Sequence, residues 1–444
     1  MTYLPDNWIL EKIGRLCELS NGRAFKPNDW VVTGLPIVRI QNLNNPTTRF
    51  NYYDKEVDER FLLRGGELLF AWSGTPGTSF GAHVWYGKKA VLNQHIFRVD
   101  FDESLIDKHF FRYAINQKLE ELINIAHGGV GLRHVTKGVF KNTQIVVPPF
   151  SEQKCIADKL DALLARVDAC RDHLERVPGI LKRFRQAVLS AAVSGQLTEE
   201  WREKNGLDEP MHVTLNETKS NTSYGSSAKS QKAGTVPVLR MGNIQDGKLD
   251  WTDLVYTSDN KEIAKYQLIT GDVLFNRTNS PELVGKTAVY KGDKPAIYAG
   301  YLIKVKCGPN LLPDYLNYCL NSPYGREWCW QVKSDGVSQS NINAQKLGEF
   351  QFLLPSLKEQ EEIARRVEVL FSFVDNLESR CHAAKKLVDN LTPALLAKAF
   401  RGELVPQDPE DEPASVLLER IHAERSAREA GGKKAAKIGK TSLE

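Results

Sequence analysis

Residues 280–287 have most of the side chains of a phosphate-binding loop, but two details argue against that chemistry. The stretch is SPELVGKT, with Ser280 where a nucleotide-binding loop has its first glycine. It continues into Ala288, Val289 and Tyr290, which favour a strand, so no helix N-terminus would face a phosphate. The nine histidines are scattered, without the spacing of a metal-binding or hydrolytic motif. The sequence therefore predicts no catalytic centre.

Polar side chains suited to hydrogen bonding gather instead in two pairs of loops. Residues 72–75 (WSGT) and 277–280 (RTNS) each follow a predicted strand, and residues 131–134 (GLRH) and 338–341 (SQSN) each follow a Gly-Val pair. Arginine suits guanine, and asparagine or glutamine suits adenine, because each can form two hydrogen bonds to the base edge. Loops also differ without functional reason, so base recognition and an ordinary surface loop both remain open. The candidate residues are Trp72, Ser73, Thr75, Arg133, His134, Arg277, Thr278, Asn279, Gln339 and Asn341.

A second group of candidates occurs at the same place in both halves of the chain. Arg39 and Arg240 each lie in a short predicted strand with a proline near its start, and an asparagine follows three residues later, Asn42 or Asn243. The arginines could contact phosphates or pair with a carboxylate inside the fold. We include Arg39, Asn42, Arg240 and Asn243 among the candidates for nucleic-acid contact.

The candidate loops belong to two copies of one segment. Residues 35–40 (LPIVRI) recur as 236–241 (VPVLRM), and residues 66–70 (GELLF) recur as 271–275 (GDVLF). The first copy also shows strands near 67–72, 95–99 and 144–147 and helical periodicity over 107–126. The sequence thus predicts an internal tandem duplication of an α/β (α+β) domain, with copies at 1–150 and 235–355. Residues 201–234, rich in Ser, Asn, Thr and Lys, are predicted to be a linker or the start of the second copy.

Each copy ends in a predicted long helix, 151–200 and 356–405. Apolar residues recur at steps of three and four, the heptad pattern that buries a narrow stripe against another helix. The pattern returns after 207 residues in the same phase. Cys170 and Cys381 occupy seam positions and are therefore predicted to be buried. Each helix follows a proline and ends near a glycine that can cap it. The two seams are Ile156, Leu160, Leu163, Val167, Cys170, Leu174 and Val177, and Ile363, Val367, Leu370, Val374, Leu377, Cys381 and Ala384.

The composition is typical of a soluble globular protein. Of the 444 residues, 41% are hydrophobic and 26% charged, and the net charge of +4 permits an anionic partner without requiring one. The apolar runs are too short to span a membrane, and no signal peptide precedes them, so we expect a cytoplasmic protein without membrane contact. The seven cysteines lack a C-x-x-C pair, which argues against a disulfide framework or a zinc site. Residues 406–444 are predicted to form an exposed short helix and a basic disordered tail.

This organisation resembles the specificity subunit of type I restriction–modification enzymes. The helical segments carry the resemblance, because residues 148–168 (PPFSEQKCIADKLDALLARVD) and 395–404 (LLAKAFRGEL) are similar to that family's central and C-terminal helices. The resemblance implies two target-recognition domains separated by two long helices that pack as an antiparallel coiled coil. Each domain would recognise one half of a bipartite target in double-stranded DNA.

The resemblance also implies partners and a division of labour. Two modification subunits would carry S-adenosylmethionine and the methyl transfer, and restriction subunits with ATP and Mg would join them. This chain would hold no cofactor and no catalytic residue. The basic turn of Lys182, Arg183 and Arg185 could bind a modification subunit, lie along phosphates or face solvent. Two alternatives remain, namely a coiled-coil scaffold with two protein- or glycan-binding domains and a self-contained methyltransferase or nuclease.

Overall fold

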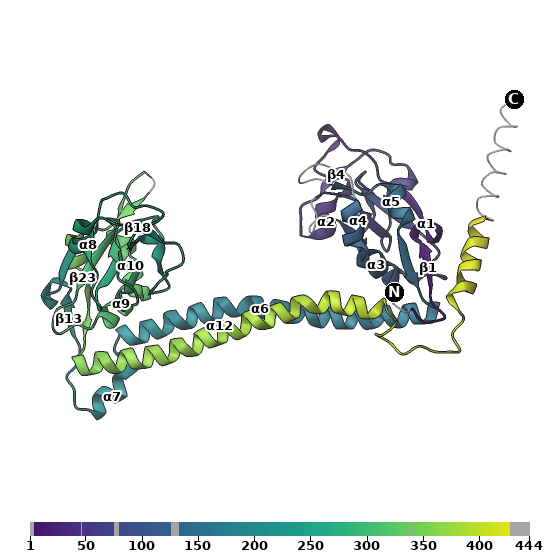
Figure 1. Cartoon of the computed structure of the whole chain (residues 1–444). Helices are drawn as coiled ribbons and strands as arrows, with labels where there is room; N and C mark the ends of the chain where they lie inside the picture. The colour runs from purple at the N-terminus through teal and green to yellow at the C-terminus, as the bar shows by residue number, and fades with distance from the viewer. Residues whose placement is uncertain (1–3, 46, 75–79, 126–132, 338, 427–444) are drawn as a thin grey trace. The chain divides into compact units, whose positions relative to one another are not determined.

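The computed structural model describes residues 4–45, 47–74, 80–125, 133–337 and 339–426 (Figure 1). The chain divides into two compact units, which are described separately below. Unit 1 comprises Met1–Asp172 and Lys385–Glu444, and unit 2 comprises His173–Ala384. Each unit therefore contains one globular domain, called domain 1 or domain 2, and a part of both long helices. No helix among the described residues is long and apolar enough to cross a membrane.

Domain 1 is built on two four-stranded sheets. The first has the order β2 (Glu18–Asn21), β10 (Ile96–Asp100), β6 (Leu68–Ala71) and β8 (Gly81–Val84), all antiparallel. The second has the order β4 (Asn51–Tyr53), β3 (Leu35–Val38), β9 (Ala90–Leu92) and β5 (Leu62–Leu63). The helical stretch predicted at 107–126 is confirmed as two helices, α3 (Lys108–Gln117) and α4 (Leu119–Ile125), which are separated at Lys118.

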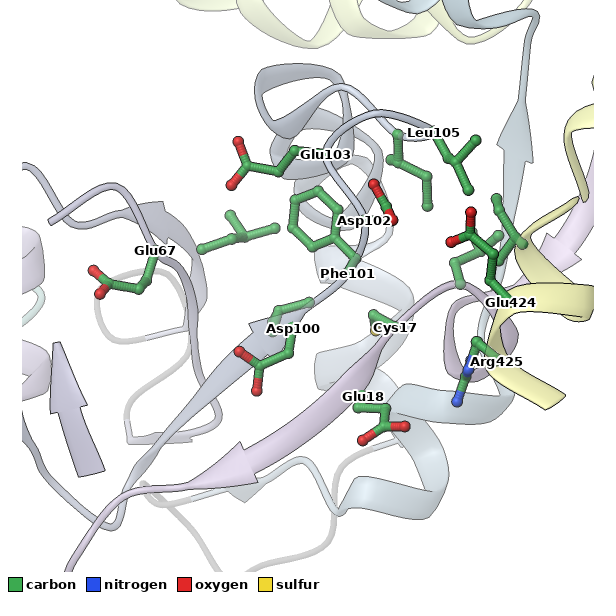
Figure 2. Close-up of a pocket in the computed structure, with 15 residues that line it drawn as sticks. Cys17, Glu18, Glu67, Asp100, Phe101, Asp102, Glu103, Leu105, Glu424 and Arg425 are labelled. Atoms are coloured by element: carbon green, nitrogen blue, oxygen red, sulfur yellow. The ribbon is translucent and has the colours of Figure 1, made fainter. Parts of the chain in front are cut away.

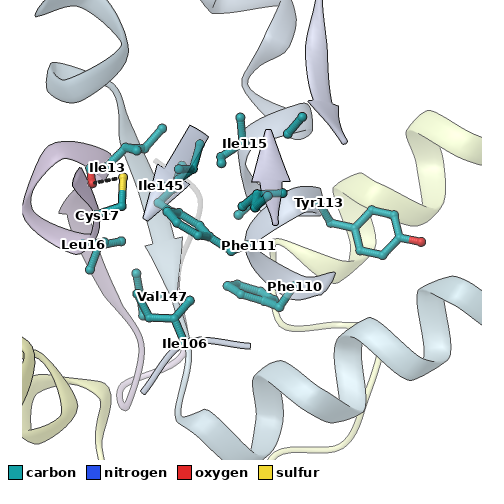
Figure 3. Packing of buried hydrophobic residues seen from close by; sticks show 14 of the residues in the cluster. Ile13, Leu16, Cys17, Ile106, Phe110, Phe111, Tyr113, Ile115, Ile145 and Val147 are labelled. Carbon is teal, nitrogen blue, oxygen red and sulfur yellow. Dashed lines mark hydrogen bonds between the residues drawn. The ribbon is translucent and has the colours of Figure 1, made fainter. Parts of the chain in front are cut away.

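The core of domain 1 continues into the long helices of unit 1. Phe110 and Phe111 of α3 are buried against Ile145 of β12 (Gln144–Val147) and Cys17 (Figure 3). β12 pairs with β1 (Ile9–Lys12) and leads directly into α6 (Phe150–Val193). The ring of Phe400, just after α12 (Leu357–Ala399), lies 5.6 Å from that of Phe110. Domain 1 and its part of the helices thus share one core.

Domain 2 repeats this construction. Its main sheet has the order β14 (Asn221–Tyr224), β23 (Leu302–Lys306), β19 (Val273–Asn276) and β21 (Thr287–Val289), and a second sheet has the order β18 (Val255–Thr257), β15 (Val236–Leu239) and β22 (Ile297–Tyr298). The packing helices are α8 (Asn260–Tyr266), α9 (Pro313–Asn321), α10 (Pro323–Val332) and α11 (Ala344–Gly348). The same strand order in both main sheets confirms the duplication of the domain.

The alternative of a linker over residues 201–234 is wrong for much of this segment. β13 (Met211–Thr214) pairs with β26 (Gln351–Leu354), and β14 pairs with β23, so the second copy begins before residue 235. Most side chains of the strands MHVT and NTSY are exposed. An exposed edge strand and a linker have similar compositions, which explains the error.

The long helices run antiparallel in each unit. In unit 1, Ile156 and Leu160 near the start of α6 share a core with Ala399 at the end of α12. In unit 2, Val188 and Leu189 near the end of α6 share a core with Ile363 near the start of α12. The heptad seam of α12 is confirmed, since its positions from Ile363 to Ala384 are all buried or half-buried. This is the packing that the family resemblance implies.

The prediction that Cys170 is buried in the seam is wrong. Cys170 is exposed, whereas Cys381 is half-buried. The contact passes instead through Arg171, whose guanidinium lies 2.7 Å from Asp168 and 3.5 Å from Asp389 of α12. Arginine can occupy such a position because its stem packs while its charge reaches a carboxylate.

The prediction of an exposed C-terminal helix is also wrong. Residues 414–426 are helical, but Ala414, Leu417, Leu418 and Ile421 are buried in the core of unit 1. Their spacing places them on one face, which packs on domain 1, while the charged face stays exposed. The N–H of Ala414 also donates to the carbonyl of Asn7 at 3.0 Å. The predicted basic tail, residues 431–444, lies outside the described residues.

A buried glutamine ties the start of each long helix to its domain. Gln153 accepts a hydrogen bond from the N–H of Asp107 at 2.9 Å and donates to the carbonyl of Pro148 at 3.0 Å. Gln360 accepts from the N–H of Leu312 at 2.8 Å and donates to the carbonyl of Pro355 at 2.8 Å. Each amide therefore links the helix to the residue that caps α3 or α9.

The glutamate before each glutamine is buried too, but its partner differs. Glu152 accepts from the indole N–H of Trp8 at 2.7 Å, and burial raises its pKa against the lowering effect of that bond. Glu359 accepts from the Thr198 hydroxyl at 2.7 Å and pairs with Arg202 at 2.8 Å. Among the described residues, only the glutamate of the second copy, Glu359, has a buried cation as its partner.

We predict that Glu152→Gln stabilises unit 1 at neutral and higher pH. A carboxyl whose pKa is raised on folding binds its proton more tightly when folded, so stability is lost as the pH rises through that pKa. Glutamine keeps an acceptor for Trp8 without the buried charge. Thermal denaturation at about pH 5 and about pH 8 should show a smaller loss with rising pH for the variant.

Glu359→Gln is the matched control and should have the opposite effect. It leaves the buried guanidinium of Arg202 without its buried partner, which costs about 3 kcal/mol at all these pH values. Equal effects of the two substitutions would contradict the difference in partners.

Candidate nucleic-acid interface

The two loops that the sequence singled out in each copy pair with one another. In domain 1, β7 (Ser73–Gly74) pairs with β11 (Arg133–His134), so that Ser73 is opposite His134. In domain 2, β20 (Thr278–Asn279) pairs with β25 (Ser340–Asn341), so that Thr278 is opposite Asn341. β7 and β20 directly follow β6 and β19, and their pairing with β11 and β25 brings the two candidate loops of each domain together.

Backbone hydrogen bonds show that Trp72 and Arg277 occupy the same position. The N–H of Trp72 donates to the carbonyl of His95 at 3.3 Å, and that of Arg277 donates to the carbonyl of Tyr301 at 3.0 Å. The carbonyl of each then accepts an N–H at 2.9 Å, from Val135 or Ile342. We call Trp72, Ser73, His95 and His134 cluster 1, and Arg277, Thr278, Tyr301 and Asn341 cluster 2.

Cluster 1 is mainly aromatic. The Trp72 ring is stacked on Phe97, with centroids 5.4 Å apart, and lies 5.5 Å from the His95 ring and 5.8 Å from the His134 ring. The Ser73 hydroxyl and Nδ1 of His134 are hydrogen-bonded at 2.9 Å. Burial, and then the nearby His134 and Arg39, lower the pKa of His95. Arg39 is therefore close enough to add its charge to this cluster.

Cluster 2 is mainly polar. The guanidinium of Arg277 lies 4.7 Å from the centroid of the Tyr224 ring and donates to Oδ1 of Asn341 at 3.4 Å. Asn341 donates in turn to the hydroxyl of Thr278 at 2.7 Å. The same backbone frame thus carries different hydrogen-bonding chemistry in the two domains.

Comparison with known proteins identifies the family of the two domains. The family model for the type I restriction modification DNA specificity domain matches residues 5–177 and 215–383. The chain belongs to this family. Its two matched segments make domains 1 and 2 two specificity domains.

Full-length relatives and solved structures agree with the family. The chain is 31% identical to the EcoBI specificity subunit of Escherichia coli, over 98% of this chain and 95% of the relative. It is 32% identical to the EcoKI specificity subunit of Escherichia coli K12, over 98% of each.

A chain from a structural study of the assembly and conformational transition of a type I restriction–modification system has a TM-score of 0.69 and 19% identity. The match covers 90% of this chain and 99% of that one. The HsdS subunit of Thermoanaerobacter tengcongensis has a TM-score of 0.59 and 19% identity, over 90% and 98%. At this identity, the two structures support the fold alone.

The asparagines predicted to contact nucleic acid are instead buried in the specificity domains. Asn42, 3% exposed, accepts from the N–H of Arg39 at 3.1 Å and donates to the carbonyl of Thr48 at 3.1 Å. Asn243, 2% exposed, accepts from the N–H of Arg240 at 2.8 Å and donates to the carbonyl of Asp250 at 3.0 Å. Because their amides bind the backbone, these residues shape the loop that carries each arginine.

The two arginines themselves differ. Arg240 lies 3.1 Å from Asp253, whose side chain is 92% exposed, so an ion pair within the fold does occur in domain 2. The guanidinium of Arg39 lies 5.4 Å from the centroid of the Trp30 ring. An exposed ion pair contributes little and can exchange for a phosphate, so both arginines remain candidates.

The remaining predicted site residues are placed as follows. Asn279 is half-buried and accepts the N–H of Ser280 at 2.8 Å, and Gln339 is exposed. Thr75 lies outside the described residues, and Arg133 is described only as part of β11. Lys182 and Arg183 are exposed.

Arg185, which the sequence groups with Lys182 and Arg183 in one basic turn, has partners within the fold. Its guanidinium pairs with Glu378 of α12 at 2.6 Å and also with Asp375. Arg185 therefore joins the two helices of unit 2 and leaves Lys182 and Arg183 as the exposed basic residues of that turn.

His95, Tyr301 and Tyr224 are members or neighbours of the clusters that the sequence analysis missed. They come next to Trp72 or Arg277 only through strand pairing, which connects residues far apart in the chain. A signal was present, because His95 and Tyr301 lie at corresponding positions of the two copies and differ in type. Position-by-position comparison of the whole copies would have found this pair.

The cavity of domain 1 has the wrong charge for nucleic acid. It has a volume of about 480 Å³ and lies between the domain and the helix of residues 414–426 (Figure 2). Arg425 contributes a cation, but carboxylates predominate, and a phosphate backbone would be repelled. The acidic lining residues are Glu18, Glu67, Asp100, Asp102, Glu103 and Glu424.

We predict that Asn243→Ala lowers the free energy of unfolding by about 2 kcal/mol, because it leaves buried backbone groups without partners. Gln339→Ala is the matched control, since this exposed side chain should change stability by less than about 0.5 kcal/mol. Urea denaturation of the two variants measures the difference. Equal stability would show that Asn243 does not hold the loop.

Proposed function

We propose that this chain is the DNA specificity subunit of a type I restriction–modification complex. Each specificity domain recognises one half of a bipartite duplex target through its cluster. The observation that carries this proposal is the pair of clusters, in which one backbone frame presents Trp72, His95 and His134 in one domain and Arg277, Tyr301 and Asn341 in the other. Two domains that bind different base sequences need a shared frame and different side chains at the contact.

The charges around the clusters support DNA as the ligand. Arg39 lies near cluster 1, and the asparagines Asn42 and Asn243 hold the loops of Arg39 and Arg240. Phosphate contacts of this kind position a protein on the duplex without reading its sequence. Proteins that neutralise phosphates bind more weakly as the salt concentration rises, so binding by this chain should be strongly salt-dependent.

The chemistry of modification belongs to partner subunits in this proposal. Modification subunits would supply S-adenosylmethionine and transfer the methyl group, and restriction subunits would supply the ATP- and Mg-dependent steps. The exposed side chains of Lys182 and Arg183, together with the exposed Phe184 and Phe373 of unit 2, are candidate contacts for a modification subunit. Work on cellular DNA would place the complex in the cytoplasm.

We predict that exchanging residues 4–149 for the same region of a relative with another target changes one half of the methylated sequence only. The whole of domain 1 moves in this exchange, while the long helices and domain 2 stay unchanged. Co-expression with the modification subunit, followed by mapping of methyladenine in the host genome, gives the result. The reciprocal exchange of residues 211–355 is the matched control and should change the other half.

Three kinds of result would contradict the proposal. Simultaneous change of both halves would mean that the domains do not recognise separate half-sites. Salt-independent binding, or binding to a protein or glycan ligand without sequence-specific DNA binding, would favour a coiled-coil scaffold instead. Methylation by the purified chain alone would favour a self-contained methyltransferase.

A further inference from the structure

Arg277 is held in one orientation by its neighbours. Its guanidinium lies over the ring of Tyr224, and the Tyr224 hydroxyl is fixed because it accepts the N–H of Ala344 at 3.0 Å. Asn341 also accepts from Nη2 of Arg277, while its own amide nitrogen donates to Thr278. With both ends of its amide engaged, Asn341 positions the arginine. A guanidinium held in this way loses little conformational freedom when it binds.

The binding capacity of Arg277 is only partly used. Its Nε is buried without a hydrogen-bond partner among the described residues. Within the same part of the chain, no carboxylate forms an ion pair with Arg277, in contrast to Arg240 and Asp253. A half-buried cation with unused donors is costly unless a ligand with acceptor atoms completes it. The side chain is therefore suited to a ligand that offers adjacent acceptors.

The duplication distinguishes a base from a phosphate as that ligand. The phosphate backbone is the same in both half-sites, so a residue that binds it should be a cation in both domains. The position of Arg277 holds Trp72 in domain 1, which has no charge and one N–H donor. A residue that selects a base is expected to differ between domains with different targets. Guanine is the base whose O6 and N7 match the paired donors of arginine.

We propose that Arg277 recognises a guanine in the half-site of domain 2, with Asn341 and Tyr224 as positioning residues. Two N–H groups of the guanidinium donate to O6 and N7 of the base. Trp72 cannot form this pair of bonds, so the equivalent residue of domain 1 does not select guanine in this way. This inference rests on the proposed function, because it assigns a base to one residue of the same interface.

The experiment uses the complex with its modification subunit and duplexes that carry the mapped target. Arg277→Gln should weaken binding to the natural duplex by about 10- to 100-fold and remove the preference for guanine at one position of the domain 2 half-site. Replacing that guanine by 7-deazaguanine removes N7 and should weaken the unsubstituted complex by about tenfold, while the variant is unaffected. Lys306→Gln, which removes an exposed cation at the far end of β23, is the matched control and should leave both measurements unchanged.

The positioning role is tested by the same duplexes. Asn341→Ala should reduce discrimination at the same guanine and leave the half-site of domain 1 unaltered, which a general loss of folding would not do. The proposal is overturned if Arg277→Gln keeps full preference for guanine, or if 7-deazaguanine weakens variant and unsubstituted complex equally. An unsubstituted complex that recognises no bipartite sequence would instead overturn the proposed function.

Discussion

The buried glutamine at the start of each long helix is the contact on which the construction of both units depends. Gln153 and Gln360 each join the first turn of a helix to the cap of α3 or α9 and to the strand-ending segment before the helix. A buried amide with an unmet donor or acceptor is costly, so three chain segments must keep one geometry. The apolar core then extends from domain to helix without interruption, as Phe110 and Phe400 show. The clusters are positioned by a sheet that belongs to this same core.

The duplication separates what the fold requires from what the ligand requires. Residues that hold the frame are the same in both copies, as with Asn42 and Asn243 or Gln153 and Gln360. Residues that face the proposed ligand differ, as with Trp72 and Arg277 or His134 and Asn341. The two copies thus place different side chains at the same backbone positions. This property links the structure to the selection of different base sequences.

Helices whose apolar residues recur at regular spacing could be predicted from the sequence, but the segments that they pack against could not. The heptad seam of α12 could be predicted because its apolar residues keep the same spacing along the helix. In α6, Arg171 contacts the other helix in place of the exposed Cys170, and the spacing of apolar residues does not predict this ion pair. The stripe of Ala414, Leu417 and Ile421 is equally regular, yet only the structure shows that it packs on domain 1. The candidate loops were found, but His95 and Tyr301 join them through long-range strand pairing. Asn42 was predicted to contact nucleic acid, but its amide binds the backbone of its own loop. The sequence cannot separate these two roles, because a polar residue after a strand is common in both.

Hydrogen–deuterium exchange of the assembled complex on DNA tests the central claim most directly. A duplex with both half-sites should protect the peptides that contain cluster 1 and cluster 2. A duplex in which one half-site is scrambled should lose protection at one cluster and keep it at the other. Equal loss at both clusters, or protection confined to the acidic cavity of domain 1, would contradict recognition of separate half-sites by the two clusters.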